Sequence, residues 1–336
     1  MQALVYTQYG SPDVLQLQEV EKPTPKAKEV LVKVQAVSVN QADLHLLRGQ
    51  PVFLRLTLGL LKPCNPILGS DIAGRVEAVG RDVTHFQTGD TVFGDLSGVG
   101  RGGFAEYVAA PADALSLKPT SVPFETAASV PMAGVTALQG LRDYGHIQSG
   151  ERVLINGASG GVGSLAVQIA KIFGAEVTAV CSTRKVEMVR KLGADRVIDY
   201  TRQDFTQTDQ PYDLIFDTVA NRSIADYRQA LTPVGRFVTT GFLPALYFQG
   251  LRLGKADQRR MENMLAKPNT KDLTFLGELL EAGQLTPTID RHYPLGEVAN
   301  ALRYVGEGHA AGKVLISIPE RDKPTIHQRS SLAVPA

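Results

Sequence analysis

Cysteine is scarce in this sequence of 336 residues, and so is any imbalance of charge. The two cysteines, Cys64 and Cys181, are too few for a disulfide framework, so we expect a reducing compartment, of which the cytoplasm is the simplest. Lysine and arginine total 35 against 34 aspartates and glutamates, with no basic stripe. This balance argues against contact with nucleic acid or with a membrane surface.

Long apolar runs are also missing. No segment reaches the roughly 18 consecutive apolar residues of a membrane-spanning helix. The start of the chain, MQALVYTQYG, has neither the basic nor the apolar part of a signal peptide. We therefore expect a cytoplasmic globular protein, with enough length for two domains of about 100–200 residues each.

Short alternating segments dominate residues 1–122. They are rich in β-branched residues and are separated by turn residues, which is typical of a barrel-like or sandwich-like β-unit. The stretch 262–336 is mixed, with helical patterns at 272–283 and 299–310 and a strand at 312–318. The strands predicted in the first part cover 30–40, 72–80, 90–96 and 102–111.

Residues 123–261 have a different hydrophobic pattern. After a helical pattern that begins near 123, short apolar strands alternate with amphipathic helices. This alternation predicts βαβ units and a doubly wound parallel sheet that is covered on both faces. The fold class is therefore α/β plus β, with a β-rich part at 1–122, an α/β domain at 123–261 and a mixed stretch at 262–336.

A glycine-rich loop, NGASGGVG, lies inside the first βαβ unit. It follows a strand at 153–156 and opens a helix at 162–173, the context of a dinucleotide-binding loop. A side chain at Gly160 or Gly161 would keep a pyrophosphate away from the backbone, and Gly163 lets the helix press onto the strand. We expect the amide groups of the first helical turn to face the phosphates.

The end of the second strand of this unit indicates which dinucleotide binds. NAD-preferring sites place an acidic residue there, to accept a hydrogen bond from the ribose 2′-hydroxyl. This chain has Ser182 and Thr183, followed by Arg184 and Lys185, which suit a 2′-phosphate and predict NADPH. The alternative is that a hydroxyl caps the next helix and that water solvates the cations.

The order of these parts resembles the medium-chain dehydrogenase/reductase superfamily, and within it the zinc-free quinone oxidoreductase branch of zeta-crystallin-like NADPH:quinone reductases. The resemblance implies a GroES-like catalytic domain formed by 1–122 and 262–336, with an inserted Rossmann domain at 123–261. It also implies, in many members, a homodimer paired through the edge strand near 236–242. The stretches that carry it are VSVNQADLHLLRG (37–49), ILGSDIAGRVEAVG (67–80), GDTVFG (89–94), NGASGGVG (156–163), GADRVIDY (193–200) and residues 289–316.

The zinc-dependent members of this superfamily carry residues that are missing here. They place a ligand cysteine near the end of the strand at 37–40 and a Gly-His-Glu after the next long loop. This chain has Ser38-Val39-Asn40 and Gly69-Ser70-Asp71 in those places, and two cysteines cannot form a four-cysteine lobe. The six histidines are scattered without ligand spacing, so we predict no metal.

The resemblance implies hydride transfer from NADPH to quinones, which need little electrophilic help. Two alternatives stay open: reduction of α,β-unsaturated carbonyl compounds, and a non-catalytic NADPH-binding protein. Asn40 is expected either to donate to the acceptor oxygen or to be a turn residue at the end of the strand. Asp43 is expected to brace Arg48 or the local backbone. His45 either donates a proton or lines the pocket.

The resemblance also assigns residues to the cofactor cleft. Those residues are Thr136, Ser159, Gly161, Val162, Ser182, Tyr200, Val219, Gly241 and Phe242. Gly160, Gly163, Arg184 and Lys185 join them from the arguments above.

One nearly apolar stretch, VFLRLTLGLL at 52–61, stands apart from these motifs. Three interpretations stay open for it. It forms a lipophilic lip over the substrate entrance, it is a helix packed on its own domain, or it lies in a dimer interface.

Overall fold

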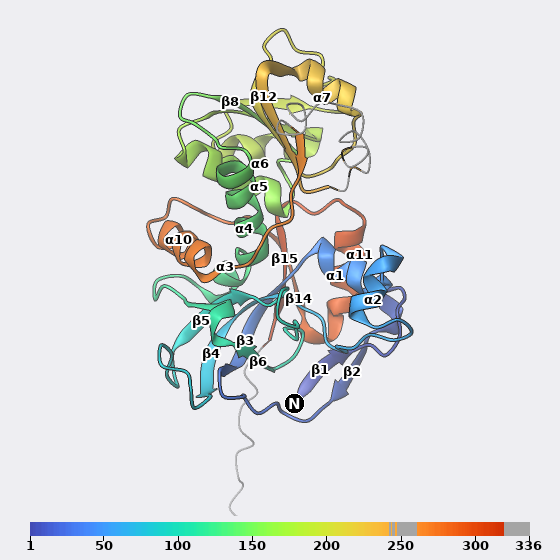
Figure 1. Cartoon of the computed structure of the whole chain (residues 1–336), viewed down its shortest axis with the longest axis vertical. Coiled ribbons are helices and arrows are strands. Elements are labelled where there is room, and N and C mark those ends of the chain that lie inside the picture. Colours follow the sequence, from blue (N-terminus) through green and yellow to red (C-terminus); the bar gives the residue numbers. More distant parts are fainter. Residues whose placement is uncertain (242, 244–245, 247–260, 319–336) are drawn as a thin grey trace, which may run out of the picture.

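The computed structural model describes all residues except 242, 244–245, 247–260 and 319–336. Its chain forms two lobes: it begins in the lower lobe of Figure 1, builds the upper lobe, and returns to the lower one. None of the described helices is long and apolar enough to cross a membrane.

The lower lobe is built on a seven-stranded sheet in the order β14-β15-β3-β4-β5-β7, with β6 paired to β3. The long strand β3 lies antiparallel to β4, β6 and β15, so the N-terminal and C-terminal parts of the chain share one sheet. The strands of this lobe are β3 (Glu29–Val39), β4 (Asp71–Val79), β5 (Thr91–Asp95), β6 (Tyr107–Pro111), β7 (Leu115–Leu117), β14 (Ile289–Pro294) and β15 (Lys313–Ser317), with a separate hairpin of β1 (Gln2–Val5) and β2 (Gln16–Glu19).

The upper lobe confirms the predicted parallel sheet. Its strand order is β10-β9-β8-β11-β12-β13, and every pairing is parallel. The strand order reverses between β8 and β11, and in open sheets of this kind ligands bind at that point, beyond the carboxyl ends of the strands. The elements are β8 (Arg152–Asn156), α5 (Gly161–Ile172), β9 (Glu176–Cys181), α6 (Val186–Lys191), β10 (Arg196–Asp199), β11 (Tyr212–Asp217), α7 (Ile224–Ala230), β12 (Leu231–Thr239) and β13 (Met261–Asn263).

Strand β13 changes two expectations. It pairs with β12 through Phe237 and Met261, so this sheet extends two residues beyond the expected end of the inserted domain at 261. The strand near 236–242, expected at the edge, is β12, and β13 covers its outer side. A three-residue strand carries too short a pattern to be recognised in the sequence.

The remaining helices connect the lobes or cover the lower sheet. The helical pattern that begins near 123 is divided in two, because Pro131 lacks an amide hydrogen and starts a new helix. Helix α10 packs against α4 and β7, and α11 packs against α1 and β15. These helices are α1 (Gln41–Arg48), α2 (Arg55–Leu58), α3 (Phe124–Ala128), α4 (Pro131–Gln139), α10 (Thr270–Glu281) and α11 (Val298–Gly306).

One hydrophobic cluster joins the two lobes. It runs from Phe93 on β5 through Leu276 on α10 to Phe216 on β11, and all three side chains are buried. Since packed side chains bridge the lobes, the positions of the sheet ends relative to one another are set by the core.

Candidate active and cofactor site

The glycine-rich loop leaves room above the start of α5. Gly160 is the N-cap residue, with φ −83° and ψ 179°, and no side chain caps the helix. A Cβ placed on Gly160 would meet only the carbonyl oxygen of Gly157, at 3.4 Å. Because the first amides of a helix have no partner within the helix, this open end suits the pyrophosphate of a dinucleotide.

Gly163 serves packing within the same loop. A Cβ at Gly163 would lie 2.1 Å from the carbonyl oxygen of Gly157 and 2.8 Å from Cα of Ala158. No side chain fits in that space, so only glycine lets α5 lie this close to the turn after β8.

The residues just before strand β15 contact the glycine-rich loop. The amide of Gly312 donates to the carbonyl oxygen of Ser159 over 2.9 Å, and Gly160 forms an isolated parallel bridge with Gly312. The next residue, Lys313, lies against the loop, because a Cβ on Gly161 would be 3.0 Å from Lys313 Cδ. Strand β15 therefore carries a residue of the lower sheet to the start of α5.

Several other expected cofactor residues gather at the carboxyl ends of the parallel strands. Ser182 follows β9, Tyr200 follows β10, Val219 follows β11 and Gly241 follows β12. Tyr200 and Val219 are about half exposed, at 51% and 49%, so both are accessible to a ligand. Phe242 lies outside the described residues.

Thr136 lies on α4, and its hydroxyl donates to the carbonyl oxygen of Met132 over 2.7 Å. Val162 is the second residue of α5 and is half-buried.

The two cations after β9 have different surroundings. Lys185 donates to the carbonyl oxygens of His309 and Ala310, at 2.7 and 2.9 Å, and burial lowers the pKa of its ammonium group. It therefore holds the segment that leads into β15. Arg184 is exposed on the short 3₁₀ turn η5 (Thr183–Lys185), and of the two it is the cation available to a 2′-phosphate.

A buried network beneath β11 was not expected from the sequence. Asp217 accepts hydrogen bonds from Nδ2 of Asn156 at 3.0 Å and from the amide of Val219 at 2.8 Å. Its other oxygen accepts from the hydroxyl of Tyr227, whose pKa is raised mainly by burial. The network fixes the turn that presents Val219. The only signal in the sequence is an aspartate at the end of an apolar strand.

A second polar cluster lies at the start of α1. Asn40 is the N-cap residue, and its amide nitrogen donates to Asp43 Oδ2 over 2.8 Å. Its side-chain Nδ2 donates to Asp71 Oδ2 at 2.9 Å and to the carbonyl oxygen of Ser38 at 3.4 Å. Lys313 Nζ donates to Asn40 Oδ1 over 2.6 Å. The donors of Asn40 are thus directed into the cluster rather than toward an acceptor molecule.

Asp71 joins four elements of the lower lobe and the linking helices. Its carboxylate accepts from Ser38 Oγ on β3 and from the amide of Met132 on α4, each at 2.8 Å. Lys313 Nζ lies 3.4 Å from Asp71 Oδ2, and both side chains are almost completely buried. Sequence reasoning missed Lys313, although a lysine inside the apolar strand GKVLISI was a usable signal.

Two further buried carboxyl groups surround this cluster. Burial raises the pKa of Asp43 to about 7, and among the described residues its Oδ1 has no hydrogen-bond partner. Burial, with the nearby Asp71, raises the pKa of Asp95 to about 6. Asp43 accepts a hydrogen bond from the backbone amide of Asn40, so it braces the backbone rather than Arg48.

His45 is exposed on the same helix and lies outside the buried cluster.

The positions where zinc ligands were considered hold oxygen-bearing side chains instead. Ser38, Ser70 and Asp71 are each fully buried, and Ser38 and Asp71 are bonded to one another. Across the described part of the chain, no group of three or more histidine, cysteine, aspartate or glutamate side chains is arranged to hold a metal ion.

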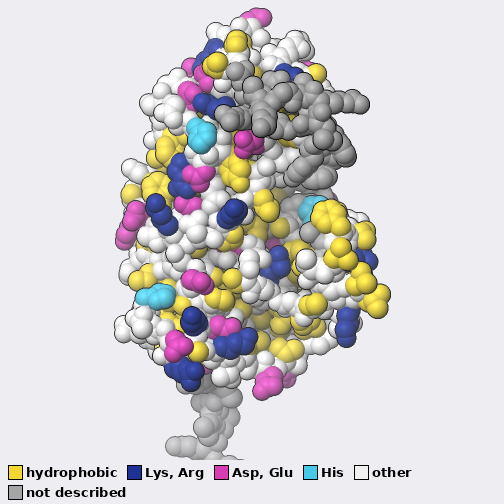
Figure 2. Space-filling model, in the orientation of Figure 1, with side chains coloured by type: hydrophobic (Ala, Val, Ile, Leu, Met, Phe, Trp, Pro, Cys, Tyr) yellow, Lys and Arg dark blue, Asp and Glu magenta, His cyan; other side chains and the backbone are white. Residues whose placement is uncertain are grey.

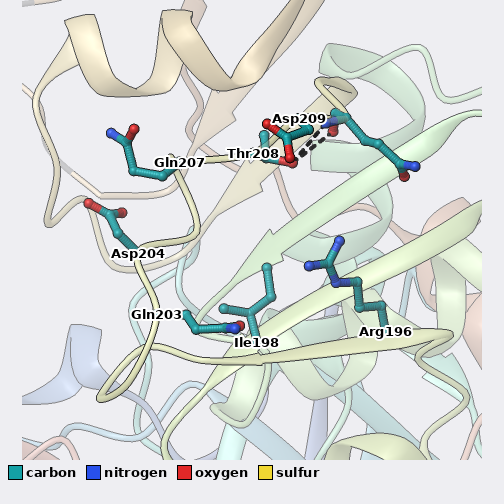
Figure 3. Close-up of a pocket in the computed structure, with 8 residues that line it drawn as sticks. Arg196, Ile198, Gln203, Asp204, Gln207, Thr208 and Asp209 are labelled. Atoms are coloured by element: carbon teal, nitrogen blue, oxygen red, sulfur yellow. Dashed lines mark hydrogen bonds between the residues drawn. The ribbon is translucent and has the colours of Figure 1, made fainter.

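A separate hollow of about 440 Å³ lies beyond the outer strand β10 (Figure 3). Its wall is polar: it includes Arg196, Gln203 and Asp204, and Thr208 is hydrogen-bonded to the backbone of Gln210. None of the residues expected to bind cofactor or substrate lines it. The hollow is therefore separate from the glycine loop and from the Asn40 cluster.

Comparisons with known proteins agree on one family. Residues 26–120 match the model described as the alcohol dehydrogenase GroES-like domain, and residues 192–316 match that of a zinc-binding dehydrogenase. The chain is 33% identical to the chloroplast envelope quinone oxidoreductase homolog of Arabidopsis thaliana, over 94% of this chain and 98% of that protein. It is 35% identical to 2-methylene-furan-3-one reductase of Solanum lycopersicum, over 94% and 79%.

A solved structure is similar as well. The quinone oxidoreductase from Coxiella burnetii superimposes with a TM-score of 0.86 at 32% identity, covering 95% of this chain and 99% of that one. The similarity to these relatives and to the solved structure extends over both lobes of the chain.

Proposed function

Because the chain belongs to the quinone oxidoreductase branch of the medium-chain dehydrogenase/reductase superfamily, it is an oxidoreductase that uses a nicotinamide cofactor, and we propose that it reduces quinones with NADPH. The observation that carries the proposal is the meeting of two sites. The glycine loop at the start of α5 and the polar cluster around Asn40 are joined by Lys313, which contacts both.

The residues present fit a dinucleotide. The open N-terminus of α5 at Gly160 would receive the pyrophosphate, and exposed Arg184 would pair with a 2′-phosphate. Tyr200 and Val219, at the ends of neighbouring strands, would line the adenosine and ribose part. When bound, the reduced cofactor supplies a hydride from its nicotinamide ring.

The chain's own contribution is orientation and charge. A quinone that accepts a hydride develops negative charge on oxygen, and a preorganised cation lowers the energy of that state. Lys313 holds a buried positive charge between the loop and Asn40, while Asn40 keeps the lysine in place through its Oδ1. In this proposal the charge comes from Lys313, since both donors of the Asn40 amide are directed to Asp71 and Ser38.

We expect this chemistry to proceed without zinc, although one matching family model is described as a zinc-binding dehydrogenase. The support is the donor set. Hydroxyls at Ser38 and Ser70 are poor zinc ligands beside the cysteine and histidine that zinc prefers. A buried ammonium group next to Asp71 also competes with a divalent cation for that carboxylate.

Reduction of α,β-unsaturated ketones is the second candidate. It rests on the similarity to 2-methylene-furan-3-one reductase, whose name describes such a ketone as substrate. A non-catalytic NADPH-binding protein remains the third. A homodimer and a cytoplasmic location stay predictions, and β13 now marks the strand edge where a partner chain would pair.

A steady-state assay separates these candidates. Purified protein is mixed with NADPH and, in turn, 1,4-benzoquinone, 9,10-phenanthrenequinone and methyl vinyl ketone, and NADPH consumption is followed by its absorbance. The proposal expects turnover with the quinones, little turnover with the enone, and none of ethanol with NADP⁺. Faster turnover of the enone would establish the second candidate. NADPH binding without turnover of any acceptor would favour the third.

A further inference from the structure

The nearly apolar stretch after α1 forms an exposed patch outside the glycine loop and the Asn40 cluster. The apolar patch consists of Val52, Phe53, Leu56, Leu60 and Leu61, whose side chains are between 62% and 89% exposed. Other exposed large apolar side chains of the described residues are scattered over the molecule, as is normal. A cluster of five exposed large apolar side chains within ten residues is unusual. Such patches mark interaction surfaces.

The backbone under the patch is firmly attached, so the outward side chains are not the result of a loose segment. The hydroxyl of Tyr9 donates to the carbonyl oxygen of Gly59 over 2.7 Å. Arg55 stacks on the ring of Tyr9 at 4.5 Å and donates to the carbonyl oxygen of Gly49. Leu58 packs against the core of the lower lobe. The segment turns one side to the domain and the apolar patch to solvent, which excludes packing on its own domain for these five residues.

The charged residues of the segment that carries the apolar patch have one sign. From residue 44 to residue 70 the chain carries Arg48, Arg55 and Lys62 and not one aspartate or glutamate. Arg48 and Lys62 are exposed, and they precede and follow the patch in the sequence. In Figure 2 the right flank of the lower lobe, beside α2 in Figure 1, shows hydrophobic side chains with lysine or arginine among them and no acidic group between them. The overall charge of +1 conceals this local excess.

The shape and size of the apolar patch distinguish among possible partners. Stable protein interfaces use about 20–30 residues on each side, many of them aromatic, whereas this patch offers five large apolar side chains with a single phenylalanine. A short helical segment with exposed apolar side chains and nearby cations instead matches the boundary of a bilayer. There, apolar groups enter the acyl region and cations meet anionic headgroups.

We propose that the apolar patch, with Arg48 and Lys62 beside it, docks the protein onto the surface of an anionic lipid bilayer. This revises the expectation from overall charge that no membrane surface is contacted. Docking of this kind needs no spanning helix, and it leaves the glycine loop and the Asn40 cluster unchanged.

Vesicle flotation of the full chain tests the proposal. Vesicles of phosphatidylcholine mixed with phosphatidylglycerol are compared with vesicles of phosphatidylcholine alone. We expect the protein to float with the anionic vesicles, and the Leu56→Ser/Leu61→Ser variant to bind at least about tenfold more weakly. Lys62→Gln should weaken binding about fivefold, because one cation near an anionic surface contributes about that factor.

A matched control uses two exposed apolar residues outside the patch. Val234→Ser/Leu265→Ser removes side chains that are 73% and 80% exposed and should bind like the wild type. Equal loss in both double variants, or no flotation of the wild type, overturns the proposal. So does light scattering in which only the Leu56→Ser/Leu61→Ser variant changes from dimer to monomer. Turnover of water-soluble 1,4-benzoquinone, measured on the same samples, reports on the proposed function separately.

Discussion

Lys313 Nζ lies 2.6 Å from Asn40 Oδ1, although 273 positions separate the two residues along the chain. A lysine ammonium group only donates hydrogen bonds, and the carboxylate of Asp71 on the other side of the amide only accepts. The orientation of the Asn40 amide is therefore determined by its two neighbours. This single contact joins the returning strand β15 to the N-terminus of α1.

Loss of the lysine charge should destabilise the fold. In Lys313→Met the carboxylate of Asp71 and Oδ1 of Asn40 stay buried without their cation, and removal of one partner from a buried pair costs about 3–5 kcal/mol. Urea unfolding should show this loss. The double variant Lys313→Met/Asp71→Asn, which also removes the negative charge, should recover part of it. A single variant as stable as the wild type would contradict the buried pair.

The raised pKa of Asp43 predicts how stability depends on pH. The folded pKa of about 7 lies above the usual value of about 3.9 in the unfolded chain. As pH rises, the unfolded chain releases this proton first, so the free energy of unfolding falls between about pH 4 and pH 7, by about 4 kcal/mol from this group. In Asp43→Asn the side chain cannot titrate, so the free energy of unfolding does not decrease with pH through this residue.

The measurement is the unfolding free energy of both proteins at several pH values. The stability of Asp43→Asn relative to the wild type should rise by about 4 kcal/mol from pH 4 to pH 8. Asp95 titrates in both proteins, so its contribution cancels in the difference. A difference that stays constant with pH would show that Asp43 is ionised in the folded protein.

Two alanine substitutions in the glycine loop should affect different properties: Gly160→Ala mainly the affinity for NADPH, and Gly163→Ala mainly the stability of the fold. Gly160→Ala has room in the protein alone and should cost less than about 1 kcal/mol, as an unfavourable N-cap. It should nevertheless lower the affinity for NADPH at least about tenfold, since its methyl group enters the pyrophosphate position. Gly163→Ala collides with the loop backbone and should cost about 3 kcal/mol.

Thermal unfolding and fluorescence titration measure the two effects. If Gly160→Ala binds NADPH as tightly as the wild type, the cofactor does not approach this end of α5.

Preference for NADPH should depend on Arg184. Arg184→Ala should weaken NADPH about tenfold, the loss of one charge-assisted contact, and leave NADH unchanged. Arg190→Ala is the control, because Arg190 lies on the next helix and pairs with Glu187 at 2.6 Å. Equal affinities of the wild type for NADPH and NADH would refute the assignment.

Metal removal should have no effect on turnover. Elemental analysis of purified protein should find no stoichiometric zinc, and incubation with a chelator should leave the rate of quinone reduction intact. One zinc per chain whose removal abolishes activity would overturn the expectation drawn from Ser38 and Ser70.

Much of the fold was predictable because its signals are local. The strands at 30–40, 72–80, 90–96 and 312–318 correspond to β3, β4, β5 and β15 within one or two residues at each end. Alternation and β-branching report on a strand wherever it pairs. The strand, loop and helix around Gly160 were predicted in the same way, since the turn constrains only its own few residues.

Features that depend on distant partners were missed. Lys185 donates to the carbonyl oxygens of His309 and Ala310, which lie more than 120 positions away in the chain. The short β13 is a strand only because β12 lies beside it. The donors of Asn40 point to Asp71 because Lys313 occupies the other side of the amide.

The sequence by itself determined the two-lobed α/β plus β architecture and the place of the dinucleotide loop, because periodicity and glycine spacing act over a few residues. Only the tertiary structure decided which cation lies inside the site, which carboxyl groups are buried with a raised pKa, and that the apolar stretch at 52–61 faces solvent. Those properties arise from desolvation and from contacts between residues far apart in the chain, and no local pattern encodes them.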